Sequence, residues 1–421
     1  MNAEKGKKSL RFETKTTVFL LCWIAYAAIY FGRANLSVAA PDIQNSMHLT
    51  KAQIGLPGTL FFWIYAFGQL INSNLGDRFT EYKMVFVGLL FTGLANLFFG
   101  FSKIYLFFLI FWGINGFAQS MLWGPIIRTL SRQYPGDMKS KISVAISTSM
   151  VGGYLAAWGL SGKLTVLSGW RWAFIVPGIF ITAFSFIWLF KSRQLQNKQD
   201  LFDVSSPLDQ DQKSHEKKST KTLISMTELI FKRKLWVIAL ICLMQGLVKE
   251  SVSLWGPVFI MERNHMDLSA LPGTILVIPI IHLFGLLLTG RLNKLFRYKE
   301  KWTILTMYIL CGLFIGLLIL LPDMPLAFSV VSTGCVLAAM FGANSMLLGV
   351  IPMKYAEYNR SSSVAGFLDF LTYMSAGVSA TFTGALANNA GWSWVLVFWL
   401  SVVVIAIALI AFSIFYDRVK S

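Results

Sequence analysis

Two basic residues stand at matching places inside long apolar segments of the sequence. Arg33 lies eight residues before Pro41, and Lys249 lies eight residues before Pro257. An ionisable side chain within a bilayer costs at least about 2.5–3.5 kcal/mol on insertion scales, so each needs a reason to be there. Two cations at equal depths could converge on one cavity and hold an anion; alternatively, each pairs with a nearby acid and serves packing. We expect Arg33 and Lys249 to bind an anionic solute.

Two acids also fall inside apolar segments, Glu250 and Asp369. Glu250 directly follows Lys249, but adjacent residues on a helix point about 100° apart and need not face each other. Either acid could neutralise a cation when the solute is absent, carry a proton, or serve as a structural ion-pair partner. The mechanism expected from the cations alone is that a bound anion offsets their mutual repulsion.

Two tyrosines precede Arg33 at helical spacing. Tyr26 and Tyr30 stand seven and three residues before it, which places all three on one face of a helix. A phenol there could donate a hydrogen bond to a bound oxyanion. Asp77 and Arg78, in a short charged loop, could form a conformational latch whose charges pair in one state only. An ordinary solvated turn is the alternative.

The sequence carries no pattern that would indicate an enzyme. We find no nucleophile–base arrangement, phosphate-cradling loop or metal-ligand cluster, and the four cysteines lie in apolar segments without a CxxC pair. His282, the only histidine within an expected span, is interpreted as a hydrogen-bonded core residue. We therefore expect neither a cofactor nor an ATP-driven pump.

The composition predicts the elements that must position these residues. Hydrophobic residues make up 55% of the 421 and charged residues only 14%, against roughly 25% charged in soluble domains. The apolar residues cluster in blocks of about 20, the length of a membrane-crossing helix. We predict an all-α membrane protein with twelve spans, at approximately 17–40, 54–75, 84–102, 104–127, 142–164, 172–190, 235–260, 270–290, 302–321, 325–353, 362–387 and 393–416.

Charge distribution predicts the orientation. The N-terminus, the C-terminus and alternate loops carry 30 of the 37 Lys and Arg, while the opposite side carries four. Both termini are therefore expected in the cytoplasm of a bacterium, with the protein in its inner membrane. A polar, Lys-rich stretch at 191–234 reads as a flexible linker. It separates an N-terminal half, 1–190, from a C-terminal half, 235–421.

The two halves are related by an internal repeat. The cation and proline of the first span recur in the seventh, and Gly169-Trp-Arg-Trp172 before the sixth span is echoed by Gly391-Trp-Ser-Trp394 before the twelfth. Transporters place their binding site at the interface of such repeats. The sequence thus predicts two pseudo-symmetric six-helix halves with a site between them.

At these residues the chain resembles the major facilitator transporters, and most of all the organophosphate:phosphate antiporter family. The resemblance covers nearly the whole chain. It rests on Tyr26-x3-Tyr30-x2-Arg33-x-Asn35, Asp77-Arg78, Trp123-Gly-Pro-x2-Arg128-Thr, Val151-Gly-Gly153, Lys249-x5-Trp255-x-Pro257 and Ala365-Gly-Phe-x5-Tyr373.

The resemblance implies a transporter that exchanges a phosphorylated metabolite for inorganic phosphate by alternating access. Arg33 and Lys249 would grip the phosphate, although the second cation is usually arginine in this family. The other binding residues implied are Tyr26, Tyr30, Tyr65, Gln69, Trp123, Ser149 and Tyr373, with Asp77, Arg78 and Arg128 in gating. Gln69 stands where well-known members have lysine, and Ser149 where they have histidine. The protein is expected to act as a monomer.

Two alternatives remain open. The related anion:cation symporters carry sugar acids and other carboxylates with protons; Gly32 weighs against this reading, because those proteins often have an acid there, whereas Asp369 and Glu250 weigh for it. The second alternative is a transporter-like membrane receptor that binds a sugar phosphate and signals to a partner.

Overall fold

The computed structural model describes residues 2–75, 80–134, 136–200, 226–231, 235–355 and 361–420, and the secondary structure assigned there is helical. The first half of the chain contains α1 (Asn2–Met47), α2 (Lys51–Leu75), α3 (Glu81–Phe101), α4 (Tyr105–Gln119), α5 (Trp123–Gln133), α6 (Gly136–Leu155), the π-helical segment η1 (Ala156–Ser161), α7 (Gly162–Ser168) and α8 (Trp172–Asp200). The second contains α10 (Met226–Phe231), α11 (Leu235–Arg263), α12 (Leu271–Ile275), α13 (Val277–Leu295), α14 (Glu300–Leu320), α15 (Leu326–Asn344), the π-helical η2 (Ser345–Val350), α16 (Ile351–Met353), α17 (Ser361–Asn389) and α18 (Trp392–Lys420).

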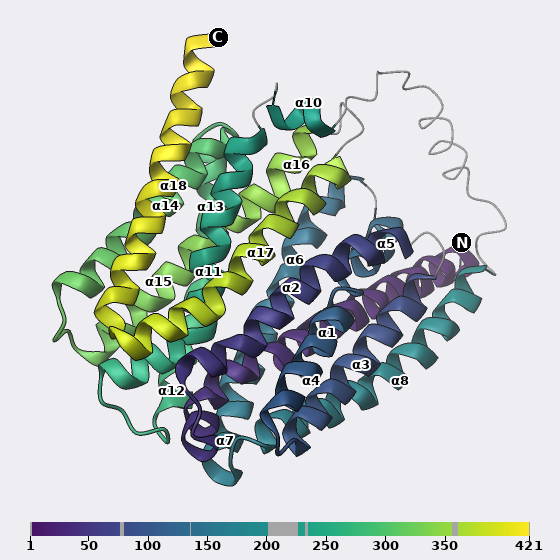
Figure 1. The fold of residues 1–421 in the computed structure, drawn as a ribbon. Coiled ribbons are helices and arrows are strands. Elements are labelled where there is room, and N and C mark those ends of the chain that lie inside the picture. The colour runs from purple at the N-terminus through teal and green to yellow at the C-terminus, as the bar shows by residue number, and fades with distance from the viewer. Residues whose placement is uncertain are drawn as a thin grey trace.

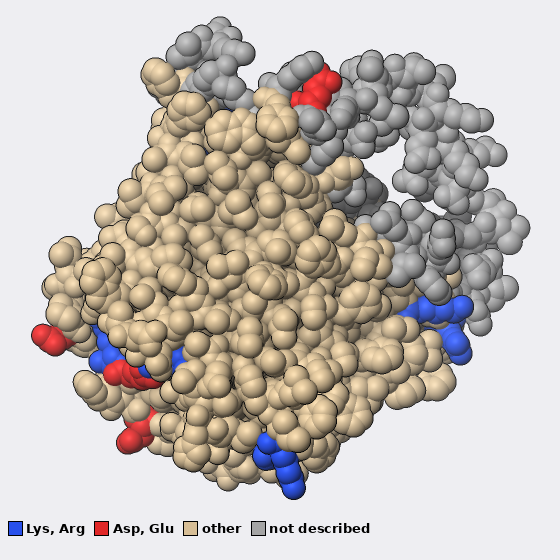
Figure 2. Space-filling model, in the orientation of Figure 1, with Lys and Arg blue, Asp and Glu red and all other residues tan. Residues whose placement is uncertain are grey.

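The helices form two bundles that meet along α2 and α17 (Figure 1). The purple-to-teal helices of the first half lie on one side, and the green-to-yellow helices of the second half lie on the other. On the face drawn in Figure 2, uncharged residues cover the broad middle, and the coloured charges lie toward its margins. This is the surface that a bilayer demands of a helical membrane protein, and it confirms the predicted fold class.

Ten of the described helical segments are long and apolar enough to cross a membrane. The two other predicted spans correspond to the run α6–η1–α7 and to α17. α17 is more polar because it packs between α2 and α11 in the interior, and α6 and η1 pack against α1. Interior helices need less apolar surface than helices that face lipid, which is why hydropathy alone ranks them lower.

The two halves repeat each other in backbone detail. Gly169 and Gly391, which open the two Gly-Trp-x-Trp motifs, both adopt a φ of 85°. Side chains rarely adopt this conformation, so the shared glycine reflects a shared turn before α8 and α18. The predicted internal repeat is thus present in three dimensions.

Several helices run further than predicted. α1 continues through Pro41 to Met47, because a membrane helix tolerates proline where neighbouring groups satisfy the freed carbonyl. α8 continues to Asp200, through Lys, Arg and Gln residues that are good helix formers. Residues 191–200 and 226–231 of the predicted linker at 191–234 are therefore helical, and its residues 201–225 and 232–234 lie outside the described ranges.

We use outer end for the end of the bundle that holds Lys51 and Trp392, following the predicted topology, and inner end for the opposite one. Towards the outer end, α2 and α17 are in close contact. The Thr59 hydroxyl donates to the carbonyl of Gly377 at 2.5 Å, and a Cβ at Gly384 would lie 2.5 Å from the carbonyl of Lys51. At the inner end of α17, a Cβ at Gly366 would meet no described atom within 4 Å. The interface between α2 and α17, which we call the α2–α17 seam, is therefore closely packed towards the outer end.

Candidate functional site

Arg33 and Lys249 meet at the boundary between the two halves, where α1 packs against α11. Glu250 joins them: its Oε2 lies 3.3 Å from Arg33 Nη2, and its Oε1 lies 2.9 Å from Lys249 Nζ. The exposed fractions of the three side chains are 11%, 5% and 5% in the order Arg33, Lys249, Glu250. Of the alternatives left open for Glu250, the structure shows the ion-pair partner, and the ion pairs join Glu250 to Arg33 and, on its own helix, to Lys249. Both side chains are long enough to curl back towards each other despite leaving the helix at different angles.

Five aromatic rings surround the Arg33 guanidinium, which lies 5.0–5.7 Å from each ring centroid. They come from three helices, α1, α2 and α17, and are Tyr30, Phe61, Phe62, Tyr65 and Tyr373. A cation is attracted to the faces of aromatic rings, and this attraction leaves the N–H donors of the guanidinium free to bind oxygen atoms. The rings thus hold the cation without consuming its hydrogen bonds.

Lys249 has a different set of neighbours. Its Nζ donates to Asn344 Oδ1 at 3.4 Å and lies 5.1 Å from the ring of Phe341 and 5.9 Å from that of Tyr373. Asn344 Oδ1 also accepts from Gln245 Nε2 at 3.0 Å. An amide of α15 and a carboxylate of α11 therefore anchor the ammonium group.

Tyr65, Gln69 and Asp369 lie next to the two cations. Gln69 Nε2 donates to the Tyr65 hydroxyl at 3.1 Å, and the Tyr65 ring lies 4.5 Å from that of Tyr373. Asp369 interacts with Gln69 and acts electrostatically on both Lys249 and Arg33. The cluster therefore contains two cations and two acids, with Glu250 in direct contact with both cations.

The structure brings some of the remaining predicted residues together with this cluster. Tyr26 lies 5.4 Å from Tyr30 and 4.7 Å from Trp123, ring centroid to ring centroid. Ser149 does not join it, because its buried hydroxyl donates to Ile146 O within its own helix.

The predicted gating residues are only partly visible. Arg128 Nη1 lies 3.9 Å from Glu81 Oε1, an ion pair that links α5 to α3 inside the first half. Asp77 and Arg78 lie outside the described residues. A second ionic contact crosses the halves at the outer end, where Lys51 Nζ lies 2.8 Å from Glu262 Oε2.

Sequence reasoning missed Asn344 and Phe341. The signal that could have found Asn344 is a second repeat: Gln119-Ser-Met-Leu-Trp-Gly124 at the α4–α5 break matches Asn344-Ser-Met-Leu-Leu-Gly349 at the start of η2. Gln119, the counterpart of Asn344, donates to Ile29 O at 3.1 Å and to Asn115 Oδ1 at 3.0 Å. The same position thus supports α1 in one half and the Lys249 ammonium in the other.

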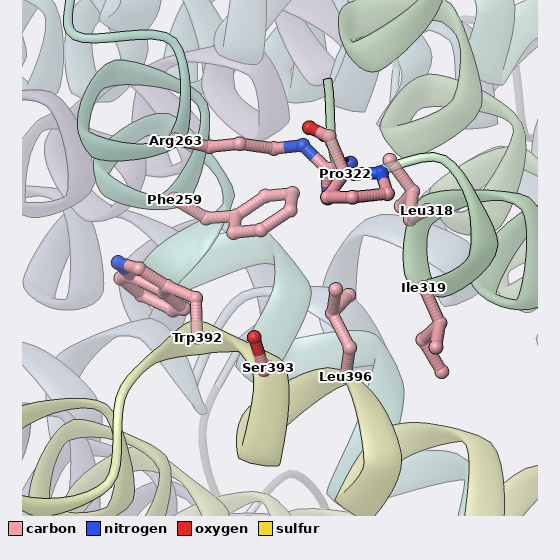
Figure 3. A pocket seen from close by; sticks show the side chains of 8 residues that line it. All are labelled: Phe259, Arg263, Leu318, Ile319, Pro322, Trp392, Ser393 and Leu396. Atoms are coloured by element: carbon pink, nitrogen blue, oxygen red, sulfur yellow. Dashed lines mark hydrogen bonds between the residues drawn. The ribbon is translucent and has the colours of Figure 1, made fainter. Parts of the chain in front are cut away.

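A pocket at the outer end is separate from this cluster (Figure 3). Its volume is about 240 Å³, and it lies among α11, α14 and α18, with Phe259, Arg263, Leu318, Ile319, Pro322, Trp392, Ser393 and Leu396 around it. Phe259 is ten residues beyond Lys249 on α11, which is roughly 15 Å at 1.5 Å per residue. The Trp392 indole N–H donates to Glu262 Oε2 at 2.8 Å, so one side of the pocket belongs to the outer contact between the halves.

Comparisons with known proteins agree with this architecture. A family model described as Major Facilitator Superfamily matches residues 22–380. A probable hexose phosphate transport protein of Chlamydia muridarum is 24% identical over 92% of this chain and 88% of its own. The membrane sensor protein UhpC of Salmonella typhimurium is 24% identical over 86% of this chain and 83% of its own.

One solved structure shows the same fold. A bacterial homologue of the human lysosomal transporter Spinster, in an inward-facing and unoccupied conformation, superposes with a TM-score of 0.73. It covers 94% of this chain and 96% of its own at 15% sequence identity.

Proposed function

Since this chain belongs to the major facilitator superfamily, a family of membrane transporters, we propose that it exchanges a phosphorylated metabolite for inorganic phosphate by alternating access. One observation carries the proposal: Arg33 and Lys249, from opposite halves, contact the same buried carboxylate of Glu250. A position where one anionic group contacts a cation from each half is where a transported anion would bind. Glu250 then acts as a resident counter-ion that the substrate replaces.

Charge favours a phosphate group over the resident carboxylate. A phosphate ester carries about −1.5 to −2 charges at pH 7 and three acceptor oxygens, whereas Glu250 offers one charge and two oxygens. Charge-assisted hydrogen bonds to arginine are strong and suit a bidentate contact. A phosphate can therefore displace Glu250 from Arg33 while still satisfying Lys249.

This arrangement changes the expected origin of coupling. The cations were expected to repel each other until an anion arrived, but Glu250 already lies between them and relieves that repulsion. Occupancy instead controls whether Glu250 pairs with the cations or is displaced by substrate. Inorganic phosphate and the phosphorylated metabolite both carry the phosphate group that displaces Glu250 from the cations. Either solute can therefore occupy the site during one direction of the transport cycle.

The relatives support the chemical class. The Chlamydia muridarum protein is named a probable hexose phosphate transporter, and a protein of Haemophilus influenzae that is 24% identical is named a glycerol-3-phosphate transporter. The same proposal places the protein in the inner membrane with both termini in the cytoplasm. It also divides the chain into two halves at 191–234 and treats the protein as a monomer. The opening of the α2–α17 seam at Thr59 and Gly377 would admit the anion from the outside.

Labelled phosphate uptake tests the proposal directly. The purified chain is reconstituted into liposomes preloaded with phosphate, at fixed pH and without a proton gradient. Exchange of external for internal phosphate, competed by hexose or glycerol phosphate, is the expected result. Uptake of a sugar acid that requires a proton gradient, with no phosphate exchange, would contradict it and direct attention to Asp369 and Glu250 as proton carriers.

A receptor is the second candidate, because one relative is named a membrane sensor protein. A sensor requires the anion site but not turnover. Saturable phosphate-ester binding by purified protein that catalyses no exchange in liposomes would favour the receptor over the transporter.

A further inference from the structure

His282 is a buried side chain that the proposed phosphate site does not use. It lies on α13, is 3% exposed, and its Nε2 has no hydrogen-bond partner among the described residues. Sequence reasoning interpreted it as a hydrogen-bonded core residue, so this unpaired nitrogen is unexpected. A position that needed only packing would be better filled by an apolar side chain, because an unpaired buried polar atom is destabilising.

The surroundings of His282 connect it to both cations. Its ring lies 3.8 Å from that of Phe341, whose other contacts include Lys249 Nζ at 5.1 Å. It also lies 6.5 Å from the ring of Tyr154, in the first half, and Tyr154 lies 5.5 Å from Tyr30 beside Arg33. His282 therefore borders the site at the boundary of the two halves rather than a remote part of the core.

A second unpaired polar atom lies on α11, one helical turn before Lys249. Gln245 is fully buried, and its Nε2 donates to Asn344, but its Oε1 has no partner in the part of the chain that the structure describes. Asn344 lies three residues after Phe341 on α15, so the two share a helix face. Lys249 contacts both of them. His282 and Gln245 therefore contact the two α15 residues, Phe341 and Asn344, that contact the Lys249 ammonium.

The chemistry of these two atoms suits a hydroxylated ligand. An amide oxygen accepts a hydrogen bond, and an imidazole nitrogen either donates or accepts one. A hydroxyl group is both donor and acceptor and can satisfy either atom, whereas an alkyl chain can satisfy neither.

We propose that His282 and Gln245 form a specificity subsite that hydrogen-bonds hydroxyl groups on the carbon skeleton of the transported anion. The inference rests on the proposed function, in which Arg33 and Lys249 hold the phosphate of the same ligand. A site built to pair with a hydroxyl discriminates against the analogue that lacks it, because the site's own polar atoms are then left unpaired.

Binding of matched ligands to the purified full chain tests the subsite by titration calorimetry. Glycerol 3-phosphate and propyl phosphate differ only in two hydroxyl groups. We expect the unaltered chain to bind glycerol 3-phosphate at least tenfold more tightly. In His282→Phe, which keeps a ring against Phe341, this preference falls by about five- to tenfold while the affinity for propyl phosphate stays within twofold.

Further variants separate a binding role from a structural one. His282→Asn retains a hydrogen-bonding group and is expected to recover part of the preference, and Gln245→Met should reproduce the loss. Tyr308→Phe is the matched control: it removes a buried hydroxyl that donates to Ile241 O at 3.3 Å on another side of the second half, and should leave the preference unchanged. Equal weakening of both esters in His282→Phe, or no preference in the unaltered chain, would overturn the proposal.

A second ligand pair distinguishes failure of the subsite from failure of the proposed function. If neither phosphate ester binds but gluconate does, the phosphate assignment is wrong, and the ratio of gluconate to hexanoate affinity becomes the readout for His282. Loss of that ratio in His282→Phe would support the hydroxyl subsite on a carboxylate carrier, and an unchanged ratio would refute it. Binding of neither class would refute both proposals.

Discussion

The two halves of the molecule present their cations in different ways. Arg33 is surrounded by five aromatic rings, and its only ion pair among the described residues is with Glu250. Lys249 is held by Glu250 at 2.9 Å and by the amide of Asn344 at 3.4 Å. The repeat therefore conserves the depth of the charge while changing how the charge is supported.

This difference indicates that the two cations have different roles in binding the anion. A guanidinium surrounded by rings offers a rigid planar fork of N–H donors, which suits two oxygens of a phosphate group. An ammonium is a compact point charge that attracts an anion without imposing one geometry. Arg33 would then determine the orientation of the phosphate, and Lys249 would contribute chiefly charge.

The largest expected effect is on the Arg33 side. Arg33→Ala should lower phosphate exchange about 100- to 1,000-fold, a loss of about 3–4 kcal/mol that lies within the roughly 2–5 kcal/mol of a buried charge-assisted contact, and Glu250 would lose one of its two cations. Arg33→Lys should recover little of it, since a lysine lacks the fork. Exchange in phosphate-loaded liposomes measures both. Arg263→Ala, at the outer pocket, is a control of the same residue type. Retained exchange in a correctly inserted Arg33→Ala protein would refute the role assigned to Arg33 in orienting the phosphate.

The next effect is on the Lys249 side and sharpens the contrast. Lys249→Ala should lower exchange about 30-fold through loss of charge. Lys249→Arg, by contrast, should keep exchange within about threefold, since a point charge is all that this position supplies. The two reciprocal swaps, Arg33→Lys and Lys249→Arg, can be compared in one assay. Equal losses in both would mean that the two cations have the same role.

Removing the resident carboxylate tests what the cations share. Glu250→Gln should tighten phosphate binding by about tenfold, because the phosphate no longer competes with an ionised carboxylate. The same change should lower the melting temperature of the empty protein, because two buried cations lose their counter-ion, and added phosphate should restore it. Calorimetry and thermal unfolding with and without phosphate measure these outcomes. Weaker phosphate binding in this variant would show that Glu250 is not a competitor.

The smallest expected effect compares the two repeat-related amides. Asn344→Ala should weaken phosphate binding about threefold, since Lys249 keeps its carboxylate partner but loses its amide anchor. Gln119→Ala, at the matching position of the first half, should leave phosphate affinity unchanged, because Gln119 supports the backbone of α1 at Ile29 and not a cation. Similar effects of the two substitutions on affinity would remove the contrast between the halves.

The fold could be predicted from the sequence because hydropathy and charge bias act over whole segments. The boundaries could not, since Pro41 lies inside α1 and the polar residues up to Asp200 continue α8. In both places the local signal for a helix end was overridden by the surrounding helix.

The cations of the site were predictable because a buried charge is costly and its spacing to a proline repeats. The pairing of Glu250 with both cations was only one of the alternatives that the sequence left open. The angle of about 100° between adjacent helical residues could not decide among them, because it describes where side chains leave the helix and not where long ones end. Asn344 carries no charge that would single it out in the sequence. Its counterpart in the repeat, Gln119, supports the backbone of α1 at Ile29 and not a cation. Ser149 was inferred from resemblance alone, and its hydroxyl bonds to its own helix.

The most direct test of the central claim is a double-mutant cycle for phosphate binding, with Arg33→Ala, Lys249→Ala and the double variant measured by titration calorimetry. If both cations hold one phosphate, removing the second after the first should cost less than removing it alone, with a coupling free energy of about 1–3 kcal/mol. Additive losses would mean that Arg33 and Lys249 do not share an anion, and would contradict the account.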